Sequence, residues 1–177
     1  FHKRLFTGLV FGGLGDVLLM ANPGNPRYFM YGLLAFLLCH LFYIRAFYLD
    51  FRSAQELDKT GARWAIGICS LFGLSFYAFL RPYLGEMRIP VMAYTFVISL
   101  MVMMAVFRNQ RVNQGSFNYI LAGAILFLIS DAILAYNKFV NAFDVAGALI
   151  MLTYMLAQYL IVMGGVERKL LNVESTT

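Results

Sequence analysis

The stretch GLGDVLLM, residues 13–20, places a carboxylate, Asp16, among glycine and aliphatic side chains. Acidic residues are rare inside membrane helices because their charge is costly to bury in hydrocarbon, and those that occur there usually serve a function. The first question is therefore whether hydrocarbon surrounds this run. If it does, the second question is what compensates for the burial of Asp16.

The composition of the whole chain indicates an integral membrane protein. Of its 177 residues, 61% are hydrophobic and 13% are charged, whereas soluble domains carry about 25% charged residues. The net charge of +5 indicates orientation in a membrane rather than binding of nucleic acid, because the bases lie in short loops. Cys39 and Cys69 both lie in apolar runs, which favours a role in packing over a disulfide or a metal site.

Apolar runs predict six membrane helices in one domain, residues 1–166, followed by a cytoplasmic tail, 167–177. Each run has about the 17–25 residues that a helix needs to cross roughly 30 Å of hydrocarbon. A turn rich in Pro and Gly, 22–27, and one long polar loop, 50–63, separate some of these runs. We predict an all-α, polytopic membrane helix bundle with helices at about 4–21, 28–49, 64–80, 89–107, 117–136 and 143–165.

Basic residues gather on one side of the predicted membrane, and this asymmetry sets the orientation. On one side lie Lys3, Arg4, Arg45, Arg52, Lys59, Arg63, Arg108, Arg111, Arg168 and Lys169. On the other side lie Arg27, Arg81, Arg88 and Lys138. We therefore expect both visible ends and the long loop in the cytoplasm, and we expect the membrane to be the inner (cell) membrane of a bacterium.

An internal repeat relates the first and the last pair of helices. A shift of 115 residues aligns GLVFGGLGDVLLM (8–20) with GAILFLISDAILA (123–135), so that their aspartates coincide, and Gly32 and Gly147 obey the same shift. We predict a parallel repeat of the kind seen in transporters. The middle pair of helices then needs a counterpart before Phe1, so we expect two more helices there, eight in all, in a 4+4 arrangement.

Asp16 and Asp131 are the acids that lie well inside the predicted helices. Both helices run outward from the cytoplasm, and the rise of about 1.5 Å per residue places Asp16 roughly 18 Å and Asp131 roughly 21 Å from the inner edge. We expect a carboxylate pair that faces a polar cavity. The alternative is two separate residues, each capping a neighbouring backbone or helping helices to associate.

Other polar side chains of the predicted helices are candidates to line the same cavity, which we place among all the helices except the third. His40 and Tyr43 share a helix face, as do Tyr154 and Gln158. Lys138 either binds a lipid phosphate or extends to the interface. For each of the other residues, the alternative to substrate binding is a hydrogen bond that joins two helices. The expected substrate-binding residues are His40, Tyr43, Tyr94, Ser130, Lys138, Tyr154 and Gln158.

The residue types present disfavour several classes of catalytic site. A zinc hydrolase needs three protein ligands and a water, whereas this chain has two histidines, one of which, His2, lies outside the predicted bilayer. The sequence has no HExxH, GxSxG, Walker or Rossmann motif. Acid–base chemistry by carboxylates, or ion-coupled transport, remains. We expect neither a metal nor an organic cofactor.

Five stretches occur in an order and spacing that identify a family: GLVFGGLGDVLLM, YGLLAFLLCHLFYI, PVMAYTFVISLMVMMAVFR, GAILFLISDAILAYNKF and LTYMLAQYLI. Together they resemble the motifs of the lysoplasmalogenase (YhhN-like) membrane protein family, over nearly the whole chain. The resemblance implies eight helices and assigns the family's pair of essential aspartates to Asp16 and Asp131. It assigns the other motif residues to His40, Tyr43, Ser130, Tyr154 and Gln158.

The resemblance also implies a reaction, because characterised members cleave the vinyl ether of lysoplasmalogens to a fatty aldehyde and a glycerophospho-ethanolamine or -choline. Such hydrolysis begins with protonation of carbon, and water then attacks the oxocarbenium ion. Burial and a second carboxylate nearby keep one carboxyl group protonated near neutral pH. One aspartate would then protonate the alkenyl carbon while the other positions water, as paired carboxylates do in glycosidases. Which of the two does which stays open.

The leading prediction is therefore a metal-independent ether hydrolase of lysophospholipids that works within the lipid bilayer. Two alternatives stay open. A proton-coupled carrier of a lipid or small solute would use the same aspartates as a proton relay. A non-catalytic membrane scaffold would tolerate the loss of both carboxylates.

Overall fold

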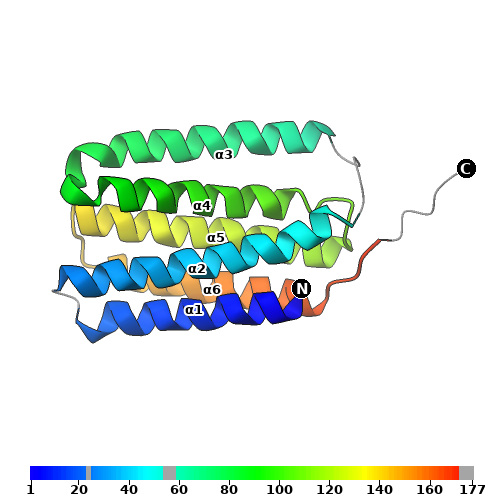
Figure 1. Ribbon diagram of the computed structural model, residues 1–177, viewed down its shortest axis with the longest axis horizontal. Helices are drawn as coiled ribbons and strands as arrows, with labels where there is room; N and C mark the ends of the chain where they lie inside the picture. The colour runs from blue at the N-terminus through cyan, green and yellow to red at the C-terminus, as the bar shows by residue number, and fades with distance from the viewer. Residues whose placement is uncertain (23–24, 54–58, 172–177) are drawn as a thin grey trace, which may run out of the picture.

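Long helices make up most of the chain in the computed structural model, which describes residues 1–22, 25–53 and 59–171 (Figure 1). In these residues the prediction of an all-α fold is confirmed. The elements are α1 (His2–Ala21), α2 (Pro26–Phe51), α3 (Lys59–Leu80), the 3₁₀ turns η1 (Arg81–Tyr83) and η2 (Gly85–Met87), α4 (Arg88–Val106), α5 (Gln114–Phe139) and α6 (Ala146–Val166).

Within the described residues, six helices are long and apolar enough to cross a membrane, as the sequence predicts. Several helix ends differ from the prediction. Helix α2 begins at Pro26 because the Asn25 side chain accepts a hydrogen bond of 3.0 Å from the Arg27 N–H and proline suits the first helical position. Helix α6 begins at Ala146 rather than at residue 143.

The predicted polar loop, 50–63, is shorter in the structure because helices extend into it from both sides. Helix α2 continues through Asp50 to Phe51, and α3 already begins at Lys59. Residues 54–58 of this loop lie outside the described residues, as do 23–24 of the predicted turn and 172–177 of the predicted tail.

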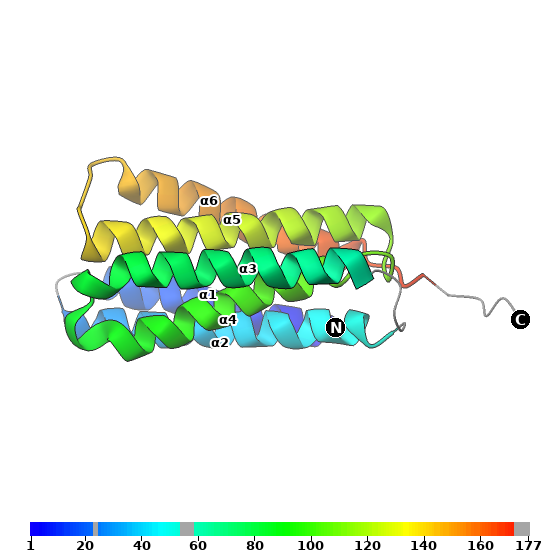
Figure 2. The same cartoon turned by 90° about the horizontal axis from the view of Figure 1, so that it is seen from above.

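Two helical hairpins form the body of the bundle (Figures 1 and 2). Helix α1 packs along α2, and α5 packs along α6, while α4 lies against both α2 and α5. Helix α3 packs chiefly against α4 and stands on the outside of the bundle. The start of α1 and the residues after α6 lie at one end, which we call the Asp50 end.

Glycines let the helices of each hairpin approach closely. A Cβ on Gly8 would lie 3.2 Å from the Cys39 carbonyl oxygen, and a Cβ on Gly123 would lie 2.8 Å from the Ala157 carbonyl oxygen. By these contacts, α1 and α5 occupy equivalent positions in their hairpins, and this supports the predicted repeat. The two helices also run in the same direction.

The structure corrects the predicted repeat for the second helix of each hairpin, α2 and α6. Gly123 follows Gly8 by 115 residues, whereas Ala157 follows Cys39 by 118. Gly32 and Gly147 are therefore not equivalent: a Cβ on Gly32 would lie 2.7 Å from Leu19, and one on Gly147 would meet nothing within 4 Å. The connection from α5 to α6, residues 140–145, is longer than that from α1 to α2, residues 22–25, and this accounts for part of the difference.

Candidate active site

Asp131 of α5 has partners on two neighbouring helices. The Tyr94 hydroxyl of α4 donates a hydrogen bond of 2.5 Å to Asp131 Oδ2. His40 Nε2 of α2 lies 3.6 Å from the same oxygen. The Asp131 side chain is 11% exposed. Both partners lie at Oδ2, so neither of them occupies Oδ1.

His40 is completely buried and surrounded by aromatic rings. Its ring lies edge-on to Phe127 and to Tyr94, with centroid distances of 4.6 Å and 5.3 Å. The distance of 3.6 Å to Asp131 is longer than an ordinary hydrogen bond. The imidazole therefore lies beside the carboxyl group and needs only a small movement to bond to it.

Asp16 of α1 lies at the end of a second polar network, which joins α1, α2 and α6. The Tyr43 hydroxyl donates a hydrogen bond of 2.5 Å to Gln158 Oε1, and Gln158 Nε2 donates one of 3.1 Å to the Tyr154 hydroxyl oxygen. Tyr154 is in turn within hydrogen-bonding reach of Asp16. Gly12 makes room for this network, since a Cβ there would lie 2.6 Å from Gln158 Nε2.

Phe127 connects the surroundings of the two acids. Its ring lies edge-on to Tyr154, the partner of Asp16, with a centroid distance of 5.3 Å, and it also contacts His40. The two carboxyl groups interact electrostatically, but each has hydrogen-bonding partners of its own. The structure thus brings Asp16 and Asp131 into one region of the bundle without a shared hydrogen-bond partner.

A pocket, which we call the chamber, lies beside Asp131. Its wall is almost entirely apolar and includes Leu33, Phe36, Phe72, Phe76, Ile98 and Leu128. Asp131, Tyr94 and Thr95 supply the polar atoms of its lining side chains, whereas Asp16 is not among the residues that line it.

The chamber differs from the predicted cavity in its helices and in its polarity. Helix α3 lines it, and no described residue of α6 does. The reason is that the polar side chains of α6, Tyr154 and Gln158, bond toward α1 and α2 instead. The large aromatic side chains Phe72 and Phe76 of α3 cover the side that the sequence pattern left open.

Of the seven predicted substrate-binding residues, Tyr94 lines the chamber, whereas the other six are not among its lining residues: His40, Tyr43, Ser130, Lys138, Tyr154 and Gln158. The Ser130 hydroxyl donates a hydrogen bond of 3.0 Å to the Ile150 carbonyl oxygen and so joins α5 to α6. Lys138 is exposed, and its Nζ lies 5.0 Å from the centroid of the Phe29 ring. Because Phe29 lines the chamber, Lys138 is placed at the end of the chamber opposite to the Asp50 end.

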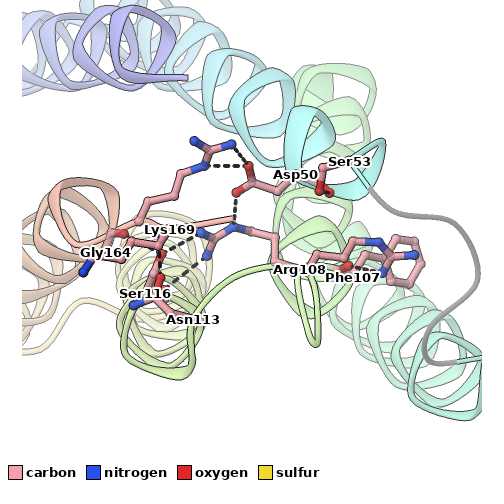
Figure 3. Close-up of polar contacts among 10 residues, drawn as sticks. Asp50, Ser53, Phe107, Arg108, Asn113, Ser116, Gly164 and Lys169 are labelled. Atoms are coloured by element: carbon pink, nitrogen blue, oxygen red, sulfur yellow. Dashed lines mark hydrogen bonds and ion pairs between the residues drawn. The ribbon is translucent and has the colours of Figure 1, made fainter. Parts of the chain in front are cut away.

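Sequence reasoning missed a buried ionic cluster at the Asp50 end (Figure 3). Asp50 and Arg108 are both completely buried, and Arg108 Nε donates a hydrogen bond of 2.8 Å to Asp50 Oδ2. Arg108 Nη2 also bonds to the Ser116 hydroxyl oxygen, at 2.8 Å, and Arg168 pairs with the other oxygen of Asp50. Burial lowers the pKa of Arg108 from its usual value, and Asp50 opposes that shift.

The ionic cluster joins segments that are distant in the sequence. Ser116 donates a hydrogen bond of 2.6 Å to the Gly164 carbonyl oxygen, so that α5 and α6 are tied to the end of α2. A signal for it was present, because Asp50 continues the stripe of His40, Tyr43 and Phe47 at spacings of three and four residues. All four side chains are completely buried.

These features define a class: a polytopic helical membrane protein with two intramembrane acids, one of which faces an apolar chamber. The chain belongs to the YhhN family, whose sequence model matches residues 1–165. No solved structure matches it.

Curated relatives of the chain share one printed activity. It is 32% identical to "Lysoplasmalogenase TMEM86A" of Homo sapiens and 35% identical to that of Bos taurus, in each case over 94% of this chain and 66% of the relative. It is 33% identical to "Lysoplasmalogenase TMEM86B" of Mus musculus, over 90% of this chain and 62% of the relative. The chain thus spans less than two thirds of the length of these relatives.

Proposed function

We propose that the protein containing this chain is a lysoplasmalogenase, a hydrolase of the vinyl ether bond of lysoplasmalogens. The observation that carries the proposal is the position of Asp131, whose carboxyl group lies in the wall of an apolar chamber. The alkenyl carbon that must accept a proton is bonded to the hydrocarbon chain of the lipid. A proton donor for that carbon therefore has to lie in an apolar wall. The names of the relatives support the same reaction.

In this proposal, Asp131 is the acid. Its protonated carboxyl group transfers the proton from Oδ1 to the alkenyl carbon, and the ether oxygen stabilises the resulting oxocarbenium ion. The hydrogen bond from Tyr94 holds Oδ2, with His40 beside it, and so fixes the direction of the other oxygen. Water adds to the cation and loses a proton, and the hemiacetal then splits into a fatty aldehyde and a glycerophospho-base. The sum is one ether and one water converted to one aldehyde and one alcohol.

Asp16 takes the second role, that of the base that orients water and accepts its proton. Its network of Tyr154, Gln158 and Tyr43 supplies hydroxyl and amide groups that hold a water molecule well, whereas the chamber beside Asp131 is apolar. Two carboxylates divided in this way resemble the acid and base of glycosidases, which pass through the same kind of cation.

An assay of aldehyde release tests the proposal. Purified full-length protein in detergent is incubated with lysoplasmalogen, and we expect the wild type to release aldehyde. Removal of a general acid or base costs roughly 100-fold or more in rate, so we expect at least that loss in Asp131→Asn and Asp16→Asn. Asp144→Asn is the matched control, because Asp144 is exposed and outside the site. A wild-type protein that releases no aldehyde refutes the proposal.

A proton-coupled carrier stays the second candidate, because intramembrane acids also serve as proton relays. A transport assay on the same protein in liposomes distinguishes the carrier from the hydrolase. A carrier moves lipid or solute across the membrane in response to a pH gradient and releases no aldehyde, and its Asp131→Asn variant loses that transport.

We propose further that the Asp50 end faces the cytoplasm, because the basic residues gather there. Ten of the bases named above belong to this end and four to the other. A reporter enzyme fused after residue 177 and active only outside the cytoplasm would stay inactive. The bacterial inner membrane as the location stays a prediction.

A further inference from the structure

A second cavity opens between α3 and α4, on the outside of the bundle. Among the described parts of the chain, residues of these two helices alone line it. Cys69, Gly73 and Tyr77 of α3 and Met92, Phe96 and Met103 of α4 belong to its wall. We call it the lateral groove. None of its lining residues carries a charge.

The lateral groove and the chamber meet at Thr95, which lines both. The Thr95 hydroxyl donates a hydrogen bond of 2.8 Å to the Val91 carbonyl oxygen, so its polar atom is turned back to its own helix. Its methyl carbon would lie 3.8 Å from a Cβ on Gly73. The boundary between the two cavities is therefore apolar, and α3 approaches α4 closely there because residue 73 has no side chain.

The position of the groove determines what can fill it. Helices α3 and α4 are both long and apolar enough to span the membrane, so their outer faces meet the hydrocarbon of the bilayer rather than water. An uncharged groove in such a face takes up an alkyl chain, because burial of apolar surface is its main source of binding energy. Lipid chains of the bilayer are the apolar molecules available there.

We propose that the lateral groove is the access route by which the single hydrocarbon chain of a lysophospholipid passes from the bilayer, past Gly73 and Thr95, into the chamber. The proposal rests on the proposed function, since it takes the chamber as the place where the chain is cleaved. The hydrocarbon chain of a lipid that arrives this way stays in an apolar environment throughout. Its vinyl ether, at the polar end of the chain, comes last to Asp131.

A pair of glycines on one helix provides a matched test in the full-length protein. A Cβ on Gly73 would lie 2.7 Å from Ser99 Oγ, across the groove, whereas one on Gly67 would meet nothing within 4 Å. We expect Gly73→Leu to lower kcat/KM at least about tenfold for long-chain lysoplasmalogen in nanodiscs. Gly67→Leu should keep the wild-type value. A short-chain, water-soluble alkenyl substrate should distinguish the variants by less than about twofold.

Equal activity of both variants on the long-chain substrate would overturn the proposal, and so would an equal loss on both substrates in Gly73→Leu. A second measurement does not depend on hydrolysis or on any variant being folded. A 1-alkyl lysophospholipid with a diazirine on its chain, which the enzyme cannot cleave, is irradiated with wild-type protein in nanodiscs. We expect the label on groove residues such as Thr95 and Ser99, and not only on the exposed Trp64 and Leu71 of α3, which lie outside the groove.

The label also separates the two proposals. If the wild type releases no aldehyde but Thr95 and Ser99 are labelled, the proposed reaction fails and the groove stands as a lipid site. If aldehyde is released and the label falls on other helices, the reaction stands and the access route is wrong. Another segment or a second copy of the chain that covers the groove would also keep the label away from it. That outcome likewise contradicts the access route.

Discussion

At the scale of single residues, Tyr94 has the most direct influence on the proposed acid. Its hydroxyl donates a hydrogen bond of 2.5 Å to Asp131 Oδ2. A hydrogen bond to a charged group contributes about 1.5–3 kcal/mol, which corresponds to roughly 10- to 100-fold in rate. We predict that Tyr94→Phe lowers kcat by that factor and changes KM little, because the ring still fills its place.

The control for this prediction is Tyr31→Phe, since Tyr31 is 53% exposed. Aldehyde release measured over a range of substrate concentrations separates kcat from KM. A Tyr94→Phe enzyme with the kcat of the wild type would show that Tyr94 does not position Asp131.

The residues of the site differ in how well the sequence predicts them. Asp16 and Asp131 stand out because each is an acid in an apolar run, and this signal is local. The partner of each acid depends on which helices are neighbours, and that information is not local. Asp50 was missed because the prediction placed it in the polar loop, 50–63, and its partners Arg108 and Arg168 are distant in the chain.

At the scale of helices, close packing of α1 against α6 holds the network at Asp16. A Cβ on Gly12 would lie 2.6 Å from Gln158 Nε2 and 2.9 Å from the Tyr154 hydroxyl oxygen, whereas one on Gly13 would meet nothing within 4 Å. We predict that Gly12→Ala folds, because these are the ends of long side chains that can move, but loses at least about tenfold in kcat.

Gly13→Ala is the matched control, one residue along the same helix. Thermal unfolding and aldehyde release are measured on both variants. Equal activity would mean that the arrangement of Tyr154 and Gln158 is not needed for the reaction.

Packing of α5 against α6 is expected to be less tolerant. A Cβ on Gly164 would lie 3.0 Å from the Ile120 backbone nitrogen and 3.0 Å from the Ser116 carbonyl oxygen. Backbone cannot move aside as a side chain does, and overpacking typically costs about 1–3 kcal/mol. We predict that Gly164→Ala lowers the free energy of unfolding by that amount. Gly147→Ala, on the same helix, should not, because its Cβ meets open space. Denaturation in detergent checks both, and equal stability contradicts the prediction.

The hydropathy of the sequence predicted the helices well because membrane-spanning length is itself a strong constraint. It did not predict their ends, which depend on caps such as Asn25. Nor did it predict that α3 lines the chamber, because the apolar residues of a membrane helix face lipid and protein alike. The shift from 115 to 118 residues in the repeat became visible only in the contacts of Gly8 and Gly123.

At the scale of the whole molecule, the ionic cluster of Asp50, Arg108, Arg168 and Ser116 ties both hairpins together at one end. Removal of one partner from a buried ion pair costs about 3–5 kcal/mol, because the other charge stays buried without compensation. We predict that Asp50→Asn destabilises the protein by that amount, while Asp144→Asn leaves the stability unchanged. Unfolding in detergent measures the effect.

The double variant Asp50→Leu with Arg108→Met distinguishes charge from shape. If the loss comes from the uncompensated charge, the double variant regains part of the stability that Asp50→Asn loses. A double variant that is less stable than Asp50→Asn would contradict this explanation.

The almost purely hydrocarbon wall of the chamber has a consequence for the fate of the product. A fatty aldehyde condenses with an uncharged amine to a Schiff base, and an enzyme that forms such aldehydes risks inactivating itself. No lysine is among the residues described as lining the chamber. In the proposed reaction, the aldehyde therefore meets no amine among these residues and can pass into the membrane without labelling the protein.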